Sequence, residues 1–149
     1  MKAIHIDDEI DSLEVMRILL EEYCPQVQLI ASVTSVDYGM KAIKEHSPDV
    51  VFLDIEMPGK NGFVLLDKLR GYDFQLVMVT GYEDYALKAI KYSALDYLLK
   101  PLDADDLCSA IKKVSVAKEA GLVRLGHYRK LAEQEDEEYN SLMIASASG

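Results

Sequence analysis

Short apolar runs alternate strictly with stretches of helical periodicity over residues 1–120. An apolar run bounded by Gly, Pro or acidic residues is typical of a buried strand, whereas apolar residues three or four apart are typical of a helix. Strands that alternate with helices are joined by crossovers, which make the strands parallel and place helices on both faces of the sheet. The predicted strands are 2–6, 27–33, 50–53, 75–79 and 95–99. The predicted helices follow them at 13–23, 35–47, 62–70, 84–92 and 103–118.

This pattern predicts a doubly wound α/β domain over residues 1–120, built on a five-stranded parallel sheet. The flavodoxin-like (βα)5 fold, with strand order 2-1-3-4-5, suits five units best. Beyond this domain we expect a charged linker or helical extension at 121–141, where Asp and Glu are frequent. An apolar run inside 142–149 predicts the first strand of a further domain, so we expect the chain to be the front part of a longer protein.

The formal net charge of −10 argues against general binding to nucleic acids or anionic lipids, because clustered Lys and Arg hold phosphate groups. The N-terminal apolar run is too short for a signal peptide. No run approaches the ~20 apolar residues of a membrane-spanning helix. We therefore expect a soluble, cytoplasmic protein without membrane contact. Cys24 and Cys108 lack metal-ligand spacing and are predicted to be small, buried apolar residues.

The most informative stretch runs from Val50 to Gly62, where four apolar residues lead directly into Asp54 and soon after into Pro58. An unbroken apolar run of this kind indicates a strand that is buried on both faces. Asp54 then lies at the carboxyl end of the strand, which is the edge where open α/β sheets bind ligands. A carboxylate in this position either caps a loop or reacts, and we interpret Asp54 as a residue that becomes phosphorylated.

Other polar residues are predicted at the same edge, because the carboxyl ends of parallel strands lie together. They are Asp7 and Asp8 after the first strand, Thr80 after the fourth and Lys100 after the fifth. Carboxylates gathered in one place raise one another's pKa unless a cation lies among them. Mg²⁺ suits Asp7, Asp8 and Asp54 together with a backbone carbonyl. The nearest candidate carbonyl belongs to Glu56.

This set of side chains suits phosphoryl transfer to a carboxylate. Asp54 would act as the nucleophile, while Mg²⁺ and Lys100 would neutralise charge on the phosphoryl oxygens. Thr80 would supply a hydroxyl donor. Each residue alone has another interpretation: Asp7 and Asp8 as helix caps, Asp54 as a loop cap and Lys100 as an ordinary surface lysine.

Several motifs in residues 1–120 resemble the receiver domain of two-component response regulators. They are Asp7-Asp8, Phe52 to Gly59 with Asn61-Gly62, Val79-Thr80-Gly81 and Asp96 to Pro101. The resemblance implies that Asp54 is the phosphoacceptor and that Asp7 and Asp8 bind the metal. It implies that Thr80 is the switch hydroxyl and that Lys100 binds the phosphate. Tyr97 matches the rotating switch aromatic, and Lys100-Pro101 matches a position that usually has a cis peptide.

The implied function is that of a signalling domain rather than an enzyme. It takes a phosphoryl group from the phosphohistidine of a cognate sensor histidine kinase, with Mg²⁺ as cofactor, and switches the 84–118 face to control a homodimer. Residues 80–90 and 94–101 are similar to receivers of the LytR/AlgR type, whose output is the DNA-binding LytTR domain. The fragment 142–149 resembles the first strand of that domain. Regulation of transcription would therefore use DNA contacts that lie mostly outside this chain.

Three alternatives remain at this point. A Mg²⁺-dependent phosphatase of similar fold would carry a second aspartate two residues after the nucleophile, where this chain has Glu56. A flavin- or nucleotide-binding protein would need a loop rich in Gly, Ser or Thr after the first strand, where this chain has Asp7-Asp8. The third alternative is a pure interaction module whose carboxylates no longer react.

Overall fold

The predicted strands form a parallel sheet in the order β2-β1-β3-β4-β5, which confirms the predicted fold class and strand order. The computed structural model describes residues 1–57, 62–81, 83 and 86–120. The strands are β1 (Lys2–Ile6), β2 (Gln28–Val33), β3 (Val50–Leu53), β4 (Gln75–Thr80) and β5 (Asp96–Leu99). The helices are α1 (Ile10–Tyr23), α2 (Val36–His46), α3 (Gly62–Lys68), α4 (Ala86–Lys91) and α5 (Ala104–Glu119). The predicted extension at 121–141 and further strand at 142–149 lie outside the described residues.

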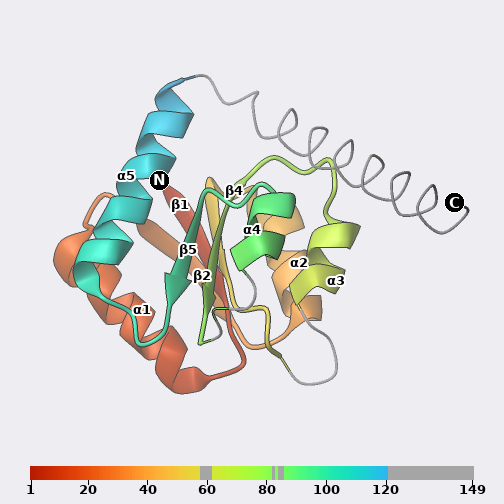
Figure 1. Cartoon of the computed structure of the whole chain (residues 1–149), viewed down its shortest axis with the longest axis horizontal. Helices are drawn as coiled ribbons and strands as arrows, with labels where there is room; N and C mark the ends of the chain where they lie inside the picture. Colours follow the sequence, from red (N-terminus) through yellow and green to blue (C-terminus); the bar gives the residue numbers. More distant parts are fainter. Residues whose placement is uncertain (58–61, 82, 84–85, 121–149) are drawn as a thin grey trace, which may run out of the picture.

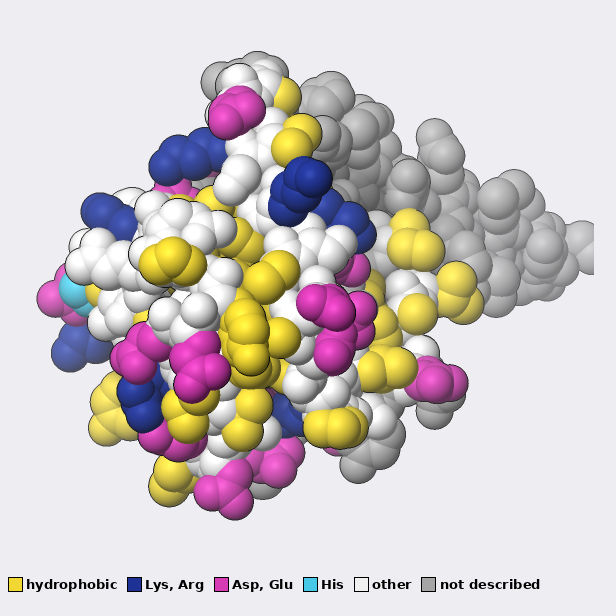
Figure 2. All heavy atoms as spheres, turned by 90° about the vertical axis from the view of Figure 1, so that its left-hand side faces the viewer, with side chains coloured by type: hydrophobic (Ala, Val, Ile, Leu, Met, Phe, Trp, Pro, Cys, Tyr) yellow, Lys and Arg dark blue, Asp and Glu magenta, His cyan; other side chains and the backbone are white. Residues whose placement is uncertain are grey.

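The sheet lies between two layers of helices. In Figure 1, α1 and α5 cover the face at the left, and α2, α3 and α4 cover the face at the right. Figure 2 looks onto the α1/α5 side, where hydrophobic side chains gather in the middle of the face with acidic side chains beside them. The central strands β3 and β4 are buried at every position, as the unbroken apolar run of β3 predicted.

The alternation of side chains along each strand decides which layer a residue faces. In β1, Ala3 belongs to the core under α1 and α5, and Ile4 belongs to the core under α2 and α3. In β3, Phe52 likewise belongs to the core under α1 and α5, and Leu53 to the core under α2 and α3. The alternation therefore places His5 and Asp7 in the row that faces α1 and α5.

Side-chain caps explain where α2 and α5 begin. Ser35 lies at the N-cap of α2, and its hydroxyl accepts a hydrogen bond from the Tyr38 backbone N–H. Asp103 caps α5 in the same way by accepting from the Asp106 N–H at 3.2 Å. Each cap satisfies one of the donors that the first turn of a helix leaves without an intrahelical partner.

The helix predicted at 62–70 ends two residues early, at Lys68. The Leu69 N–H is shared between the carbonyls of Leu65 and Leu66, which tightens the last turn. Gly71 then adopts a φ of 95°, a conformation that side-chain-bearing residues rarely adopt and that turns the chain toward β4. β2 also starts one residue later than predicted, because the Val27 N–H donates to the carbonyl of Cys24 rather than to the sheet.

Gly62 begins α3 in direct contact with the chain around Asp54. A Cβ atom on Gly62 would lie 3.0 Å from the backbone oxygen of Asp54 and 2.9 Å from Cδ1 of Ile55. The Gly62 N–H donates to the Ile55 carbonyl at 3.0 Å. A residue without a side chain is therefore needed for α3 to pack this closely against the end of β3.

The helix α4 (Ala86–Lys91) buries little of its apolar surface. Ala89 is the one buried residue described in α4, whereas Leu87 is 80% exposed and Ile90 is 69% exposed. Tyr92, just after α4, stacks on Phe63 of α3 with a centroid separation of 5.3 Å and donates its hydroxyl to Asp67. Little buried apolar area therefore holds α4 on the sheet.

Among the described helices, none has the length and apolar character needed to cross a membrane.

Candidate functional site

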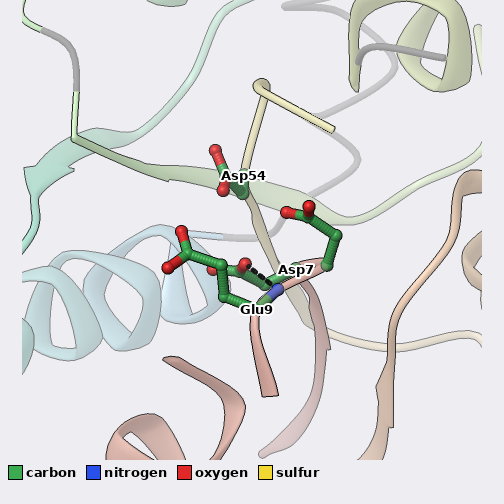
Figure 3. Close-up of side chains that lie close together, drawn as sticks. Asp7, Glu9 and Asp54 are labelled. Carbon is green, nitrogen blue, oxygen red and sulfur yellow. Dashed lines mark hydrogen bonds between the residues drawn. The ribbon is translucent and has the colours of Figure 1, made fainter. Parts of the chain in front are cut away.

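Lys100 joins three carboxylates at the carboxyl edge of the sheet. Its Nζ atom lies 2.7 Å from Oδ2 of Asp7, 3.0 Å from Oδ2 of Asp54 and 3.0 Å from Oε1 of Glu9. These residues follow β5, β3 and β1, so the structure brings together side chains that are far apart in the sequence. Figure 3 shows Asp7 and Glu9 after β1 with Asp54 beside them. The prediction that Asp7, Asp54 and Lys100 meet is confirmed.

Backbone hydrogen bonds orient the two buried carboxylates. Asp7 is fully buried, and its Oδ1 accepts from the Glu9 N–H at 2.9 Å, the dashed line in Figure 3. Asp54 is 3% exposed, and its Oδ1 accepts from the Glu56 N–H at 3.0 Å. Glu9 occupies the N-cap of α1 without a side-chain cap bond, so neither Asp7 nor Asp8 is the N-cap residue.

Carboxylate oxygens of four residues come close enough to hold one cation. One oxygen from each of Asp7, Asp8, Glu9 and Asp54 lies within 4.8 Å of the others. An all-oxygen set with two buried carboxylates matches the ligands that Mg²⁺ takes in proteins. The donor set therefore fits the metal predicted from the sequence, and it adds Glu9 to the candidate ligands.

The pKa of Asp54 is raised to about 6, and burial is the largest cause. The ion pair with Lys100 opposes this shift, while the neighbouring charge of Asp7 adds to it. Sequence reasoning named repulsion between carboxylates as the reason for a raised pKa, whereas desolvation has the larger effect at Asp54. Burial alone would lower the pKa of Lys100, but hydrogen bonds to Asp7, Asp54 and Glu9 hold it above its usual value.

A cavity of about 960 Å³ opens at this site. Its polar wall includes Asp8, Glu9, Asp54 and Lys100, and Asp11 and Ser12 of α1 extend that wall. Its apolar wall is formed by Val15, Met57, Val79 and Leu102, among others. The carboxylate of Asp54 therefore meets a space large enough for a phosphoryl donor beside acidic groups and one lysine.

The two predicted switch residues belong to the opposite face of the sheet. Thr80 ends β4 and is fully buried, and its backbone carbonyl accepts from the Lys100 N–H at 2.9 Å. Tyr97 of β5 is partly buried and packs against the core under α2 and α3. The peptide between Lys100 and Pro101 is cis, as the resemblance implied. Glu56 is exposed beside the cavity, and its carbonyl remains a predicted metal ligand.

Sequence reasoning did not single out His5 or Glu9 as part of the site. His5 lines the cavity, is fully buried, and its Nε2 lies 3.8 Å from Oδ2 of Asp7. Its position two residues before Asp7 places both side chains on one face of β1, a signal that the sequence contained. In the sequence, Glu9 is the third residue of the acidic run that begins at Asp7. Its ion pair with Lys100 could be identified only from the folded structure.

Comparison with known proteins agrees with this geometry. Residues 3–112 match the model of the response regulator receiver domain family. An uncharacterized response regulatory protein of Vibrio cholerae is 39% identical over 115 residues, which cover 76% of this chain and 48% of that protein. The sensory transduction protein LytT of Enterococcus faecalis is 37% identical, covering 81% of this chain and 50% of LytT. The chain thus spans about half the length of these curated relatives.

Solved structures also resemble this fold. The REC domain of AraT, a response regulator from Geobacillus stearothermophilus, matches with a TM-score of 0.71 and 29% identity over 80% of this chain and 95% of that domain. The response regulatory domain of mrkE from Klebsiella pneumoniae has a TM-score of 0.73 at 24% identity, over 80% of this chain and 99% of that one, which supports the fold alone. These matches favour a receiver over the phosphatase and flavin-binding alternatives. The chain therefore belongs to the response regulator receiver domain family of two-component systems.

Proposed function

We propose that Asp54 accepts a phosphoryl group from the phosphohistidine of a cognate sensor histidine kinase in a Mg²⁺-dependent reaction. The observation that carries this proposal is the position of the Asp54 carboxylate. It is buried at the wall of the cavity, 3.0 Å from the Lys100 ammonium, and one of its oxygens is within 4.8 Å of oxygens from Asp7 and Asp8. A nucleophile, a cation and a metal-binding set thus lie at one point.

The chemistry asks little of the protein beyond position and charge. A carboxylate oxygen of Asp54 attacks phosphorus, an O–P bond forms, and the P–N bond of phosphohistidine breaks. With a pKa of about 6, Asp54 is largely ionised at neutral pH and able to attack. Asp7, Asp8 and the Glu56 carbonyl would hold Mg²⁺, which would neutralise charge on the phosphoryl oxygens. Lys100 exchanges its carboxylate partners for a phosphoryl oxygen.

Phosphorylation by a small donor tests the phosphoacceptor directly. Treatment with phosphoramidate and Mg²⁺ is expected to add one phosphoryl group to the intact chain, because phosphoramidate supplies the same P–N bond as phosphohistidine. Asp54→Asn is expected to remove the adduct, and a chelator is expected to suppress it in the unaltered chain. Intact-mass spectrometry checks both results. Asp11→Asn is the matched control, since Asp11 lines the same cavity but is exposed. An adduct that persists in Asp54→Asn would refute the assignment.

The proposed signal crosses the sheet. Asp54 and Lys100 line the cavity at the edge beside α1, whereas Tyr97 packs in the core under α2 and α3. Thr80 directly follows Val79, which lines the cavity, and the Thr80 carbonyl accepts a hydrogen bond from the Lys100 N–H. We propose that Thr80 turns toward the phosphoryl group and that Tyr97 then moves inward. The test compares dimerisation of Thr80→Ala and of the unaltered chain, each with and without phosphorylation. If phosphorylation changes dimerisation equally in both, Thr80 has no part in the switch.

We further propose that phosphorylation promotes a homodimer through the 84–118 face. Leu87 and Ile90 of α4 are largely exposed apolar residues on this face, and the packing of α4 on the sheet is slight. Replacing Leu87 with Glu is expected to weaken the phosphorylated dimer at least tenfold, or about 1.4 kcal/mol. Analytical ultracentrifugation of the phosphorylated protein checks this. Val64→Glu on α3 is the control and is expected to leave dimerisation intact.

The output is proposed from the relatives. The match to LytT proteins supports a LytTR-type DNA-binding domain as the part that the receiver controls, and hence regulation of transcription. This chain, with its net charge of −10, is not itself expected to bind DNA. An electrophoretic mobility assay that showed tight DNA binding by this chain alone would contradict that division of roles.

A further inference from the structure

The two cysteines of the chain meet between α1 and α5. Cys24 caps the C-terminus of α1, Cys108 lies in the second turn of α5, and their sulfur atoms are 3.5 Å apart. They are separated by 84 positions in the sequence, so their spacing did not predict the contact. The prediction of a buried apolar residue is confirmed for Cys24, whereas Cys108 is only partly buried.

We propose that Cys24 and Cys108 form a reversible oxidation site, in which hydrogen peroxide converts the thiol pair into an intramolecular disulfide. A disulfide requires an S–S distance of about 2.05 Å, so the sulfurs must approach by about 1.5 Å. Both residues lie near helix ends, and the C-cap of α1 has non-helical backbone angles. The approach therefore needs a small shift at one helix end rather than a rearrangement of the sheet.

The different exposure of the two thiols sets the order of steps. Cys108 is only partly buried, so its sulfur attacks hydrogen peroxide. An S–O bond forms, the O–O bond breaks, and the hydroxide that leaves takes the thiol proton of Cys108 to become water. Cys108 is thereby oxidised to a sulfenic acid and the peroxide is reduced. The Cys24 sulfur then attacks the Cys108 sulfur; an S–S bond forms and the S–O bond breaks. The hydroxide leaves with the Cys24 proton as a second water.

The surroundings of Cys24 suit a resolving thiol better than a first nucleophile. It is 1% exposed, and burial raises its pKa to about 11, so it remains protonated while Cys108 reacts. Cys108 has a further contact across the same interface, from its Sγ to the Tyr23 carbonyl at 3.8 Å. The disulfide would tie the end of α1 to the beginning of α5 and so constrain two helices that cover one face of the sheet.

The test treats the 149-residue chain with hydrogen peroxide and then with N-ethylmaleimide, read by intact mass. The expected product is a monomer that has lost two hydrogen atoms and takes no maleimide, with the change reversed by dithiothreitol. Because the closed loop is long, oxidation is expected to raise the melting temperature by roughly 10 °C.

Single variants separate the proposed pair from independent oxidation. In Cys24→Ser, peroxide is expected to leave a sulfenic acid on Cys108 that dimedone traps. In Cys108→Ser, Cys24 is expected to stay a thiol under the same treatment. Two maleimide additions to the peroxide-treated chain, or disulfide-linked dimers as the main product, would overturn the proposal. Neither result depends on phosphorylation of Asp54.

Discussion

Lys100→Met is expected to lower the free energy of unfolding by about 3 kcal/mol at neutral pH in the absence of metal, because it leaves buried carboxylates without their cation. Lys100 is 16% exposed and pairs with Asp7 and Asp54, whose side chains are 0% and 4% exposed. Removal of one partner of a buried ion pair costs more than the pair contributes, since the remaining charge stays in a desolvated place. Urea denaturation at neutral pH checks the value.

Two further measurements tie this loss to charge. Mg²⁺ is expected to stabilise Lys100→Met more than the unaltered chain, because the metal replaces the missing positive charge. Acidification is expected to reduce the difference in stability between Lys100→Met and the unaltered chain. Lys100 lowers the pKa of Asp54, so removal of Lys100 raises that pKa further. Once Asp54 takes up a proton, the cost of burying its charged form disappears.

Lys113→Met is the control for Lys100→Met. Lys113 pairs with Asp96 at 3.0 Å, but its side chain is 51% exposed, so the pair contributes little in water. The control variant is expected to unfold within about 0.5 kcal/mol of the unaltered chain. Equal losses in the two lysine variants would show that the position of Lys100 among buried carboxylates has no energetic importance.

His5→Leu is expected to remove most of one pH-dependent contribution to stability. Burial, with a smaller effect of Lys100, lowers the pKa of His5 to about 3, and both ring nitrogens find no hydrogen-bond partner among the described residues. A group with a lowered folded-state pKa contributes stability that is present above its unfolded-state pKa of about 6.5 and is lost as the pH falls below that value. The unaltered chain therefore loses stability on acidification through this residue.

The expected size follows from the linkage relation. Between about pH 7.5 and pH 4.5, the free energy of unfolding of His5→Leu should rise by about 3 kcal/mol relative to the unaltered chain. The raised pKa of Asp54 acts in the opposite direction, but it is present in both proteins and largely cancels in the difference. Chemical denaturation at several pH values gives the comparison.

Phe52→Leu is the matched control for His5→Leu. The Phe52 ring packs edge-on against His5 at a centroid distance of 6.4 Å and carries no titrating group. Its replacement is expected to destabilise the chain by about 1 kcal/mol at every pH. A pH dependence in His5→Leu that runs parallel to that of the unaltered chain would show that His5 does not stay neutral in the folded protein.

The sheet and most of the site could be predicted because parallel strands impose one shared edge. The unbroken run of β3 fixed Asp54 at that edge, and Lys100 followed from the end of β5 in the same way. Helix boundaries were less predictable, because the shared hydrogen bond of Leu69 that ends α3 is a matter of local geometry rather than of apolar pattern. The predicted roles of Thr80 and Tyr97 remain predictions.

Contacts between distant helices were beyond what the sequence could show. Cys24 and Cys108 each fit an apolar pattern, and the pattern contains no information about which helix faces which. The buried, unpartnered ring of His5 was equally invisible, since a strand pattern specifies a face but not the hydrogen bonds available there. The same limit applied to Glu9, whose contact with Lys100 crosses from the start of α1 to the end of β5.

The close fit of Gly62 against the end of β3 makes Asp54 the fixed point of the domain. Its backbone N–H donates to the Ile6 carbonyl at 2.9 Å, and the first residue of α3 leaves no room for the chain behind it to shift. A group added to Asp54 would therefore displace its neighbours rather than the strand that carries it. On the same face of the sheet as α3, the helix α4 rests on the buried Ala89 and yields most easily. The domain thus combines a rigidly held Asp54 at the end of β3 with a loosely packed helix, α4.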